Sequence, residues 1–156
     1  MKIPRVYLDT SVIGSCFDDE FQVWSNALFQ DLRKEKIIAV TSFLVAAEIN
    51  DAPEMVKEKY QQLLKNKTEV IKENEDSELL LNSYLKHCIL PQRFIDDMNH
   101  IALATVACVD MLVSWNFKHI VRYDKIRLFK AVNIENGYKT IEIFSPREVT
   151  DYGKEI

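Results

Sequence analysis

The chain has 156 residues, of which 47% are hydrophobic and 28% charged, a composition typical of one globular domain spanning residues 1–156. Its net charge of −4 counts against a non-specific nucleic-acid binder, which usually needs a basic surface. The apolar run in the opening MKIPRVYLDT is too short for a signal peptide or a membrane span, so we expect a cytoplasmic protein without membrane contact. The three cysteines are odd in number and widely spaced, which predicts buried, reduced thiols.

Short apolar runs alternate with amphipathic segments along the chain. In chain order we expect a strand at 5–8, a helix at 19–34, a strand at 37–40, a helix capped near Ser42 and interrupted by Pro53, a helix at 54–64, a strand at 69–71, helices at 77–88 and 94–108, a strand at 111–113, a helix from about 122 and a strand at 140–144. This alternation predicts an α/β fold, a three-layer α/β/α sandwich with a central parallel sheet of four to five strands.

Acidic and amide side chains stand at the ends of these elements. Asp9 ends the first strand, and Glu48 lies on an otherwise apolar helix. Asp97 opens the helix at 94–108, and Asn116 follows the strand at 111–113. Sites in parallel α/β sheets form beyond the carboxyl ends of the strands, so these side chains can converge. Hard divalent cations prefer such oxygen ligands, and a bound cation can orient water for phosphodiester hydrolysis.

Four segments together resemble the PIN-domain family over nearly the whole chain, and most closely its VapC-like branch. They are LDTSV at 8–12, AAE at 46–48, DMNHIA at 97–102 and SWNFKH at 114–119. The resemblance implies an endoribonuclease that depends on magnesium or manganese and acts on RNA. It also implies a homodimer and, as in many members of this branch, a toxin with a small antitoxin protein as its partner.

The resemblance assigns catalytic roles to Asp9, Glu48, Asp97 and Asn116, and metal binding to the first three. Asn116 stands where the family often has aspartate, and a neutral ligand there favours one firmly bound cation over two. The residues expected to support these ligands are Thr10, Ser114 and His100.

Each candidate also has a structural interpretation. Asp9 could cap a helix, and Glu48 could pair with a buried base. Asp96 also lies in the first turn of its helix and could take the role assigned to Asp97. Trp115 and the aromatic stripe at 19–34 favour packing, in the core or a dimer interface, over ligand binding. The basic segment at 118–130 is either a solvated helix face or a contact for phosphate.

Two other functional classes fit parts of the pattern. A PIN fold that has lost efficient catalysis could act as an RNA-binding or scaffold module, and Asn116 is the feature that supports it. A flavodoxin-like or response-regulator-like signalling domain also carries an acid after its first strand. The second acidic pair and the downstream lysine of that class are not evident here, so the nuclease is favoured.

Overall fold

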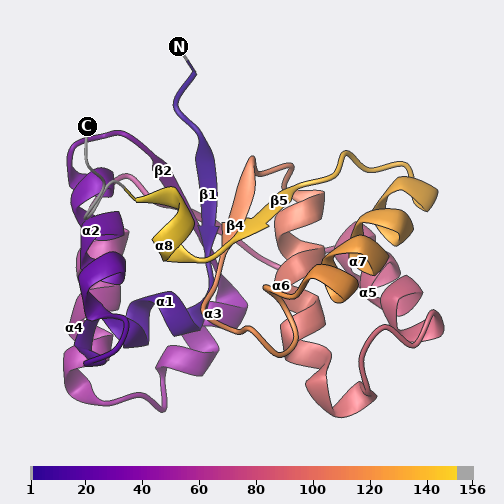
Figure 1. Ribbon diagram of the computed structural model, residues 1–156, viewed down its shortest axis with the longest axis horizontal. Coiled ribbons are helices and arrows are strands. Elements are labelled where there is room, and N and C mark those ends of the chain that lie inside the picture. Colours follow the sequence, from indigo (N-terminus) through magenta and orange to yellow (C-terminus); the bar gives the residue numbers. More distant parts are fainter. Residues whose placement is uncertain (1, 151–156) are drawn as a thin grey trace.

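The computed structural model describes residues 2–150, which form a five-stranded sheet with helices on both faces (Figure 1). The strands are β1 (Arg5–Leu8), β2 (Ile38–Ser42), β3 (Glu69–Ile71), β4 (Met111–Val113) and β5 (Glu142–Phe144). All neighbouring strands are parallel, in the order β3-β2-β1-β4-β5. The predicted α/β sandwich with a parallel central sheet is confirmed.

The central strands are mainly apolar because helices cover them on both faces. Val6, Tyr7 and Leu8 of β1 are each at most 1% exposed, and β4 beside them buries Leu112 and Val113 completely. The edge strand β3 is more open, with Val70 47% exposed. The centre of the sheet therefore belongs to the core, and its edge strand β3 is partly exposed to solvent.

The helices are α1 (Thr10–Gly14), α2 (Gln22–Arg33), α3 (Phe43–Ile49), α4 (Glu54–Leu64), α5 (Glu75–Lys86), α6 (Ile95–Val106), α7 (Tyr123–Glu135) and α8 (Pro146–Val149), with 3-10 turns η1 (Ser15–Phe17) and η2 (Gln92–Phe94). Figure 1 shows α2 and α4 on one side of the sheet and α5, α6 and α7 on the other. The short α8 is absent from the expected elements because four residues are too few to show helical periodicity. Within residues 2–150, no helix is long and apolar enough to cross a membrane.

Side-chain caps explain where two helices begin. Ser42 Oγ accepts the Val45 backbone N–H at 3.2 Å and starts α3, as the sequence predicts. The helix α5 begins at Glu75, two residues before its expected start, because Asn74 and Ser77 form a reciprocal capping box.

The prediction of three buried cysteines is wrong for two of them. Cys16 is buried, but Cys88 and Cys108 are exposed. Both exposed cysteines follow a helix C-cap and have positive φ angles of 54° and 55°. Because this backbone conformation ends a helix, it turns their side chains out of the core.

The aromatic stripe expected at 19–34 packs mainly inside the protein. Leu28, Phe29 and Leu32 of α2 are 1–3% exposed and belong to the core, whereas Val23 is 37% exposed. The core interpretation of this stripe therefore holds for its central residues.

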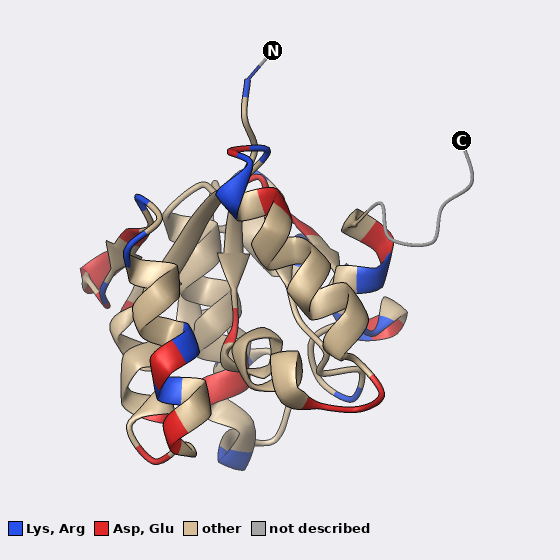
Figure 2. Ribbon diagram, turned by 90° about the vertical axis from the view of Figure 1, so that its left-hand side faces the viewer, with Lys and Arg blue, Asp and Glu red and all other residues tan. Residues whose placement is uncertain are grey.

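The basic segment at 118–130 is largely engaged with neighbouring groups. Arg122 pairs with Asp124 at 2.8 Å, and Lys130 pairs with Glu142 at 3.4 Å. Lys125 Nζ donates to the Ile89 carbonyl at 2.9 Å. In Figure 2, Lys and Arg are scattered over several elements, while an acidic residue lies directly beyond the tip of a central strand. These contacts favour the solvated helix face.

Candidate active site

The strand order reverses between β1 and β4, and the first acid lies at this reversal. The chain passes from β1 to β2 on one side and from β4 to β5 on the other. Such a switch point leaves a crevice at the carboxyl ends of the two strands, where ligands bind in open α/β sheets. Asp9 directly follows β1, and Ser114 directly follows β4.

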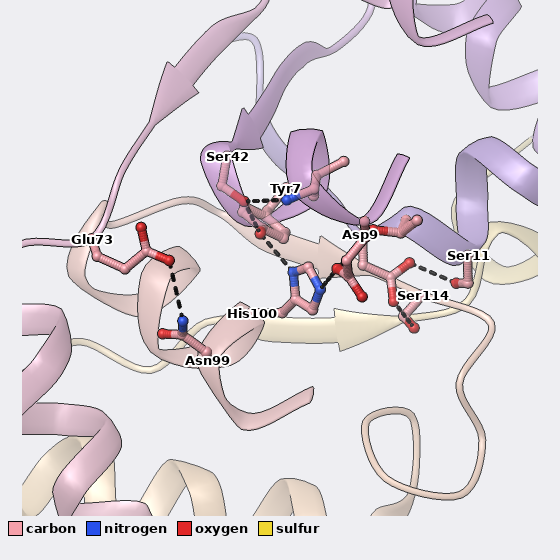
Figure 3. Close-up of polar contacts among 11 residues, drawn as sticks. Tyr7, Asp9, Ser11, Ser42, Glu73, Asn99, His100 and Ser114 are labelled. Carbon is pink, nitrogen blue, oxygen red and sulfur yellow. Dashed lines mark hydrogen bonds and ion pairs between the residues drawn. The ribbon is translucent and has the colours of Figure 1, made fainter. Parts of the chain in front are cut away.

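Two serine hydroxyls hold the Asp9 carboxylate (Figure 3). Ser114 Oγ donates to Asp9 Oδ2 at 2.6 Å, and Ser11 Oγ donates to Oδ1 at 2.6 Å. Asp9 is the N-cap residue of α1, but its side chain makes no capping hydrogen bond. The carboxylate is therefore directed at the serines instead of at the helix end.

Burial dominates the electrostatics of Asp9. The residue is 4% exposed, and burial raises the pKa of its carboxyl, although the charge of His100 and the serine hydrogen bonds oppose that rise. Both side-chain partners are neutral hydroxyls, so an ionised Asp9 is only partly compensated. A cation beside Asp9 would supply the missing compensation.

Glu48 is the end of a chain of hydrogen bonds that runs through His100. Thr10 Oγ1 donates to Glu48 Oε1 at 2.9 Å, and His100 Nε2 lies 2.6 Å from the same oxygen. On its other side, His100 Nδ1 is 2.7 Å from the Tyr7 hydroxyl, which lies 2.7 Å from Ser42 Oγ (Figure 3). Ser42, which caps α3, is thus joined to Glu48 of the same helix through Tyr7 of β1 and His100 of α6.

Glu48 and His100 form an ion pair. Burial opposes the charged form of each and is the largest single influence. The hydrogen bond between them, their charge attraction, the Thr10 hydrogen bond to Glu48 and the acids near His100 together outweigh it. The pKa of Glu48 therefore lies below its ordinary value and the pKa of His100 above its own. The acids that add to the positive charge of His100 include Asp9 and Asp97. His100 thus places one positive charge among the three candidate acids.

Asp97 lies on the first turn of α6 and binds a second histidine. Its Oδ2 is 2.7 Å from His119 Nδ1, and the His119 ring packs on Phe94 with ring centroids 3.9 Å apart. Asp97 is half-buried, whereas Asp96 is exposed. The geometry therefore gives Asp97, and not Asp96, the inward position.

Asn116 shapes the turn that follows β4. Its Oδ1 accepts the His119 backbone N–H at 3.0 Å, and its carbonyl accepts the Val121 N–H at 2.8 Å. The Asn116 N–H donates to Ser114 Oγ at 2.9 Å. The amide oxygen of Asn116, a residue expected to be catalytic, is thus engaged in the turn, where it positions His119 beside Asp97.

The donor set suits a hard divalent cation, but the acids are not gathered into a finished site. Among residues 2–150, no three His, Cys, Asp or Glu side chains lie close enough together to hold an ion. Glu48 Oε2 and Asp97 Oδ1 make no hydrogen bond with the described residues, so both can accept a ligand. Carboxylate oxygens of this kind fit magnesium or manganese. Binding one ion with all three acids requires their side chains to rotate toward one another.

The supporting residues expected from the sequence all contact an acid. Thr10 and His100 bind Glu48, and Ser114 binds Asp9. Two further contacts were not assigned from the sequence. Ser11 supports Asp9, and His119 binds Asp97 across 22 residues.

No protein-family model and no curated protein matches the sequence. Among solved structures, the fold is similar to one chain in the crystal structure of VapBC2 from Rickettsia felis bound to a DNA fragment from their promoter. The TM-score is 0.58 at 14% sequence identity, and the alignment covers 90% of this chain and 98% of that chain. The likeness establishes the α/β fold and agrees with the PIN-like architecture that the sequence resemblance implies.

Proposed function

We propose that this chain is a divalent-metal-dependent endoribonuclease that hydrolyses phosphodiester bonds of RNA. The observation that carries the proposal is that Asp9, directly after β1, and Glu48 of α3 both interact with His100 at the carboxyl edge of a PIN-like sheet. Carboxylates that rotate toward one another in such a crevice would repel without a cation, and they provide the ligands that phosphodiester hydrolysis uses.

Each residue has a role in this proposal. Magnesium or manganese would be held by Asp9, Glu48 and Asp97, and when bound it would supply a Lewis acid for the phosphate and an activated water. Asp9 is held in place by its two serines. The pair of His100 and Glu48 keeps the acids from repelling one another before an ion enters.

The proposed biological role is that of the toxin in a toxin–antitoxin pair. The fold likeness to a chain of VapBC2 and the VapC-like sequence segments support it. A small antitoxin protein encoded beside this chain is the expected partner, and a homodimer is the expected assembly. Inspection of the neighbouring gene tests the first, and light scattering at micromolar concentration tests the second.

One observation favours a second candidate, a catalytically weak RNA-binding or scaffold module. Glu48 is already paired with His100, and Asn116 replaces an acid with a neutral amide that is engaged in a turn. A site of this kind could bind RNA and metal without efficient turnover.

Cleavage of end-labelled single-stranded RNA separates the two candidates. Wild-type protein should cut in magnesium or manganese and stop cutting when EDTA is added. The Asp9→Asn variant should lose at least about a hundredfold in rate, because it removes a charged ligand. The control variant Glu58→Gln changes an exposed acid of α4 and should cut like wild type. Metal-dependent RNA binding without cleavage of any RNA would favour the weak module.

A further inference from the structure

A cavity of about 720 Å³ is lined by Trp115, the residue that follows Ser114, and aromatic rings form much of its wall. The rings belong to Phe21, Trp24, Trp115 and Phe117, and the guanidinium of Arg147 lies at the same cavity. We propose that this cavity binds an unpaired nucleobase of the RNA substrate, next to the phosphate that is cleaved. The inference rests on the proposed function, and it contradicts the expectation that Trp115 and the stripe at 19–34 serve packing alone.

Trp115 is a rigid floor for the cavity. It is 8% exposed, and its ring stacks on Phe21 with centroids 4.1 Å apart and planes 18° apart. Its Nε1 donates to Ser25 Oγ at 2.7 Å, and Ser25 in turn bonds Ser15 at 2.6 Å. The indole is therefore held at both its face and its polar edge.

The remaining rings are open to a ligand. Phe117 is 50% exposed and lies 6.0 Å from Trp115, while Phe21 and Trp24 are half-buried. Exposed aromatic rings around a fixed ring are the platforms on which single-stranded nucleic acids stack their bases. A cavity of this volume is also within the range of small-ligand sites and accepts a base with room for its ribose.

The polar groups at the cavity suit a nucleotide. The Arg147 guanidinium lies 5.3 Å from the centre of the Trp24 ring, so a positive charge stands at the edge of the aromatic surface. It can contact a phosphate while the base covers the rings. The exposed Glu20 carboxylate can accept a hydrogen bond from a base amino group. The second carboxylate at the cavity, Glu148, already accepts from the Ser145 backbone N–H at 2.6 Å and from its hydroxyl at 3.1 Å. An aromatic floor, the Arg147 cation and the Glu20 acceptor together match a nucleotide better than an apolar peptide side chain.

One serine hydroxyl connects the cavity to the acids. Ser11 Oγ accepts the Trp115 backbone N–H at 2.9 Å and donates to Asp9 Oδ1 at 2.6 Å. Trp115 also directly follows Ser114, which holds the other Asp9 oxygen. The cavity wall is therefore connected, through Ser11 and Ser114, to both oxygens of the Asp9 carboxylate.

Tryptophan fluorescence provides a direct test, because both tryptophans of the chain line this cavity. Metal-free protein in EDTA is titrated with single-stranded ribo-trinucleotides of each base and with an abasic trinucleotide of equal charge. At least one base-containing trinucleotide should quench the fluorescence saturably, and the abasic one should not. The Phe117→Ala variant should bind about fivefold or more weakly. The control Tyr123→Ala removes a ring that is 76% exposed on α7 and should bind like wild type.

The result separates the cavity from the nuclease because the titration requires neither metal nor turnover. Base-dependent quenching without RNA cleavage supports the cavity and contradicts the nuclease. RNA cleavage without base-dependent quenching, or with equal quenching by the abasic trinucleotide, overturns the cavity and leaves the nuclease standing. Unchanged affinity in a folded Phe117→Ala protein, verified by its melting curve, also overturns the cavity.

Discussion

At Asp9 a carboxylate is buried with two neutral hydroxyls as its side-chain partners, so its charge lowers stability while no cation is present. The folded-state pKa is raised, mainly by burial. The contribution of Asp9 to stability is thus fully present below its unfolded pKa and is lost as pH rises through the folded pKa. At neutral pH the charged form of Asp9 should lower the stability of the metal-free protein.

Replacing Asp9 by asparagine should therefore stabilise the metal-free protein at neutral pH. The amide removes the charge, and it can contact both serines if the hydroxyl of one rotates to accept from the new NH₂ group. We expect a rise in Tm of roughly 2–4 °C, the shift that about 1 kcal/mol makes in a chain of this size. Melting curves in EDTA should show the gain shrinking as pH falls toward the ordinary range of an aspartate. A gain that is constant across pH would mean that Asp9 is already neutral.

The adjacent acids Asp96 and Asp97 provide a matched pair of variants. Asp97→Asn should abolish most cleavage and weaken metal binding, because Asp97 points inward to His119. Asp96→Asn should retain wild-type cleavage, because its side chain is exposed. Cleavage rates and metal titrations of both variants measure this difference. Loss of activity in the Asp96 variant alone would place the catalytic acid one position earlier.

At the scale of elements, some helices contribute residues to the candidate site and others only stabilise the fold. The short α1 presents Thr10 and Ser11 to two acids, and the cap of α3 joins the hydrogen-bond chain through Tyr7. The helix α5 contributes no residue to the site and packs on α6 and α7. Changes in α5 should therefore alter stability without altering the chemistry.

The capping box of α5 tests this division. Asn74→Ala removes the acceptor for the Ser77 backbone N–H and should cost about 1 kcal/mol of unfolding free energy. Urea unfolding measures the loss. The control Asn50→Ala changes an exposed C-cap asparagine whose side chain makes no hydrogen bond with the described residues, and it should cost less. Cleavage by the Asn74 variant should require the same metal concentration as wild type. A changed metal requirement would contradict the separation of α5 from the site.

For the whole molecule, metal binding should appear as added stability. A cation that binds only the folded chain raises the free energy of unfolding by about 2.7 kcal/mol at a hundred times its Kd. Melting curves should thus shift upward with magnesium or manganese concentration. The shift should be smaller in Asp9→Asn and unchanged in the exposed variant Glu58→Gln. Equal shifts in wild type and Asp9→Asn would show that the stabilising ion binds elsewhere.

The sequence by itself determined the elements and the places of the acids. Apolar runs ending at Leu8 and Val113, the cap at Ser42 and the break at Pro53 are local signals, and the structure has elements that follow them. Because parallel strands end at one edge, the same signals also predict that residues following β1 and β4 come together. The contact of Ser114 with Asp9 agrees with that expectation.

Tertiary structure alone decided which side chains meet across the elements. The pairing of His100 with Glu48, the use of the Asn116 oxygen in a turn, and the exposure of Cys88 and Cys108 depend on how α3, α6 and the loops are oriented. The aromatic cavity likewise joins α2, the turn after β4 and α8, which are far apart in the chain. Periodicity reveals which face of an element is apolar, but not which neighbour that face meets. Those contacts follow from strand order and helix packing, and they exist only in the folded chain.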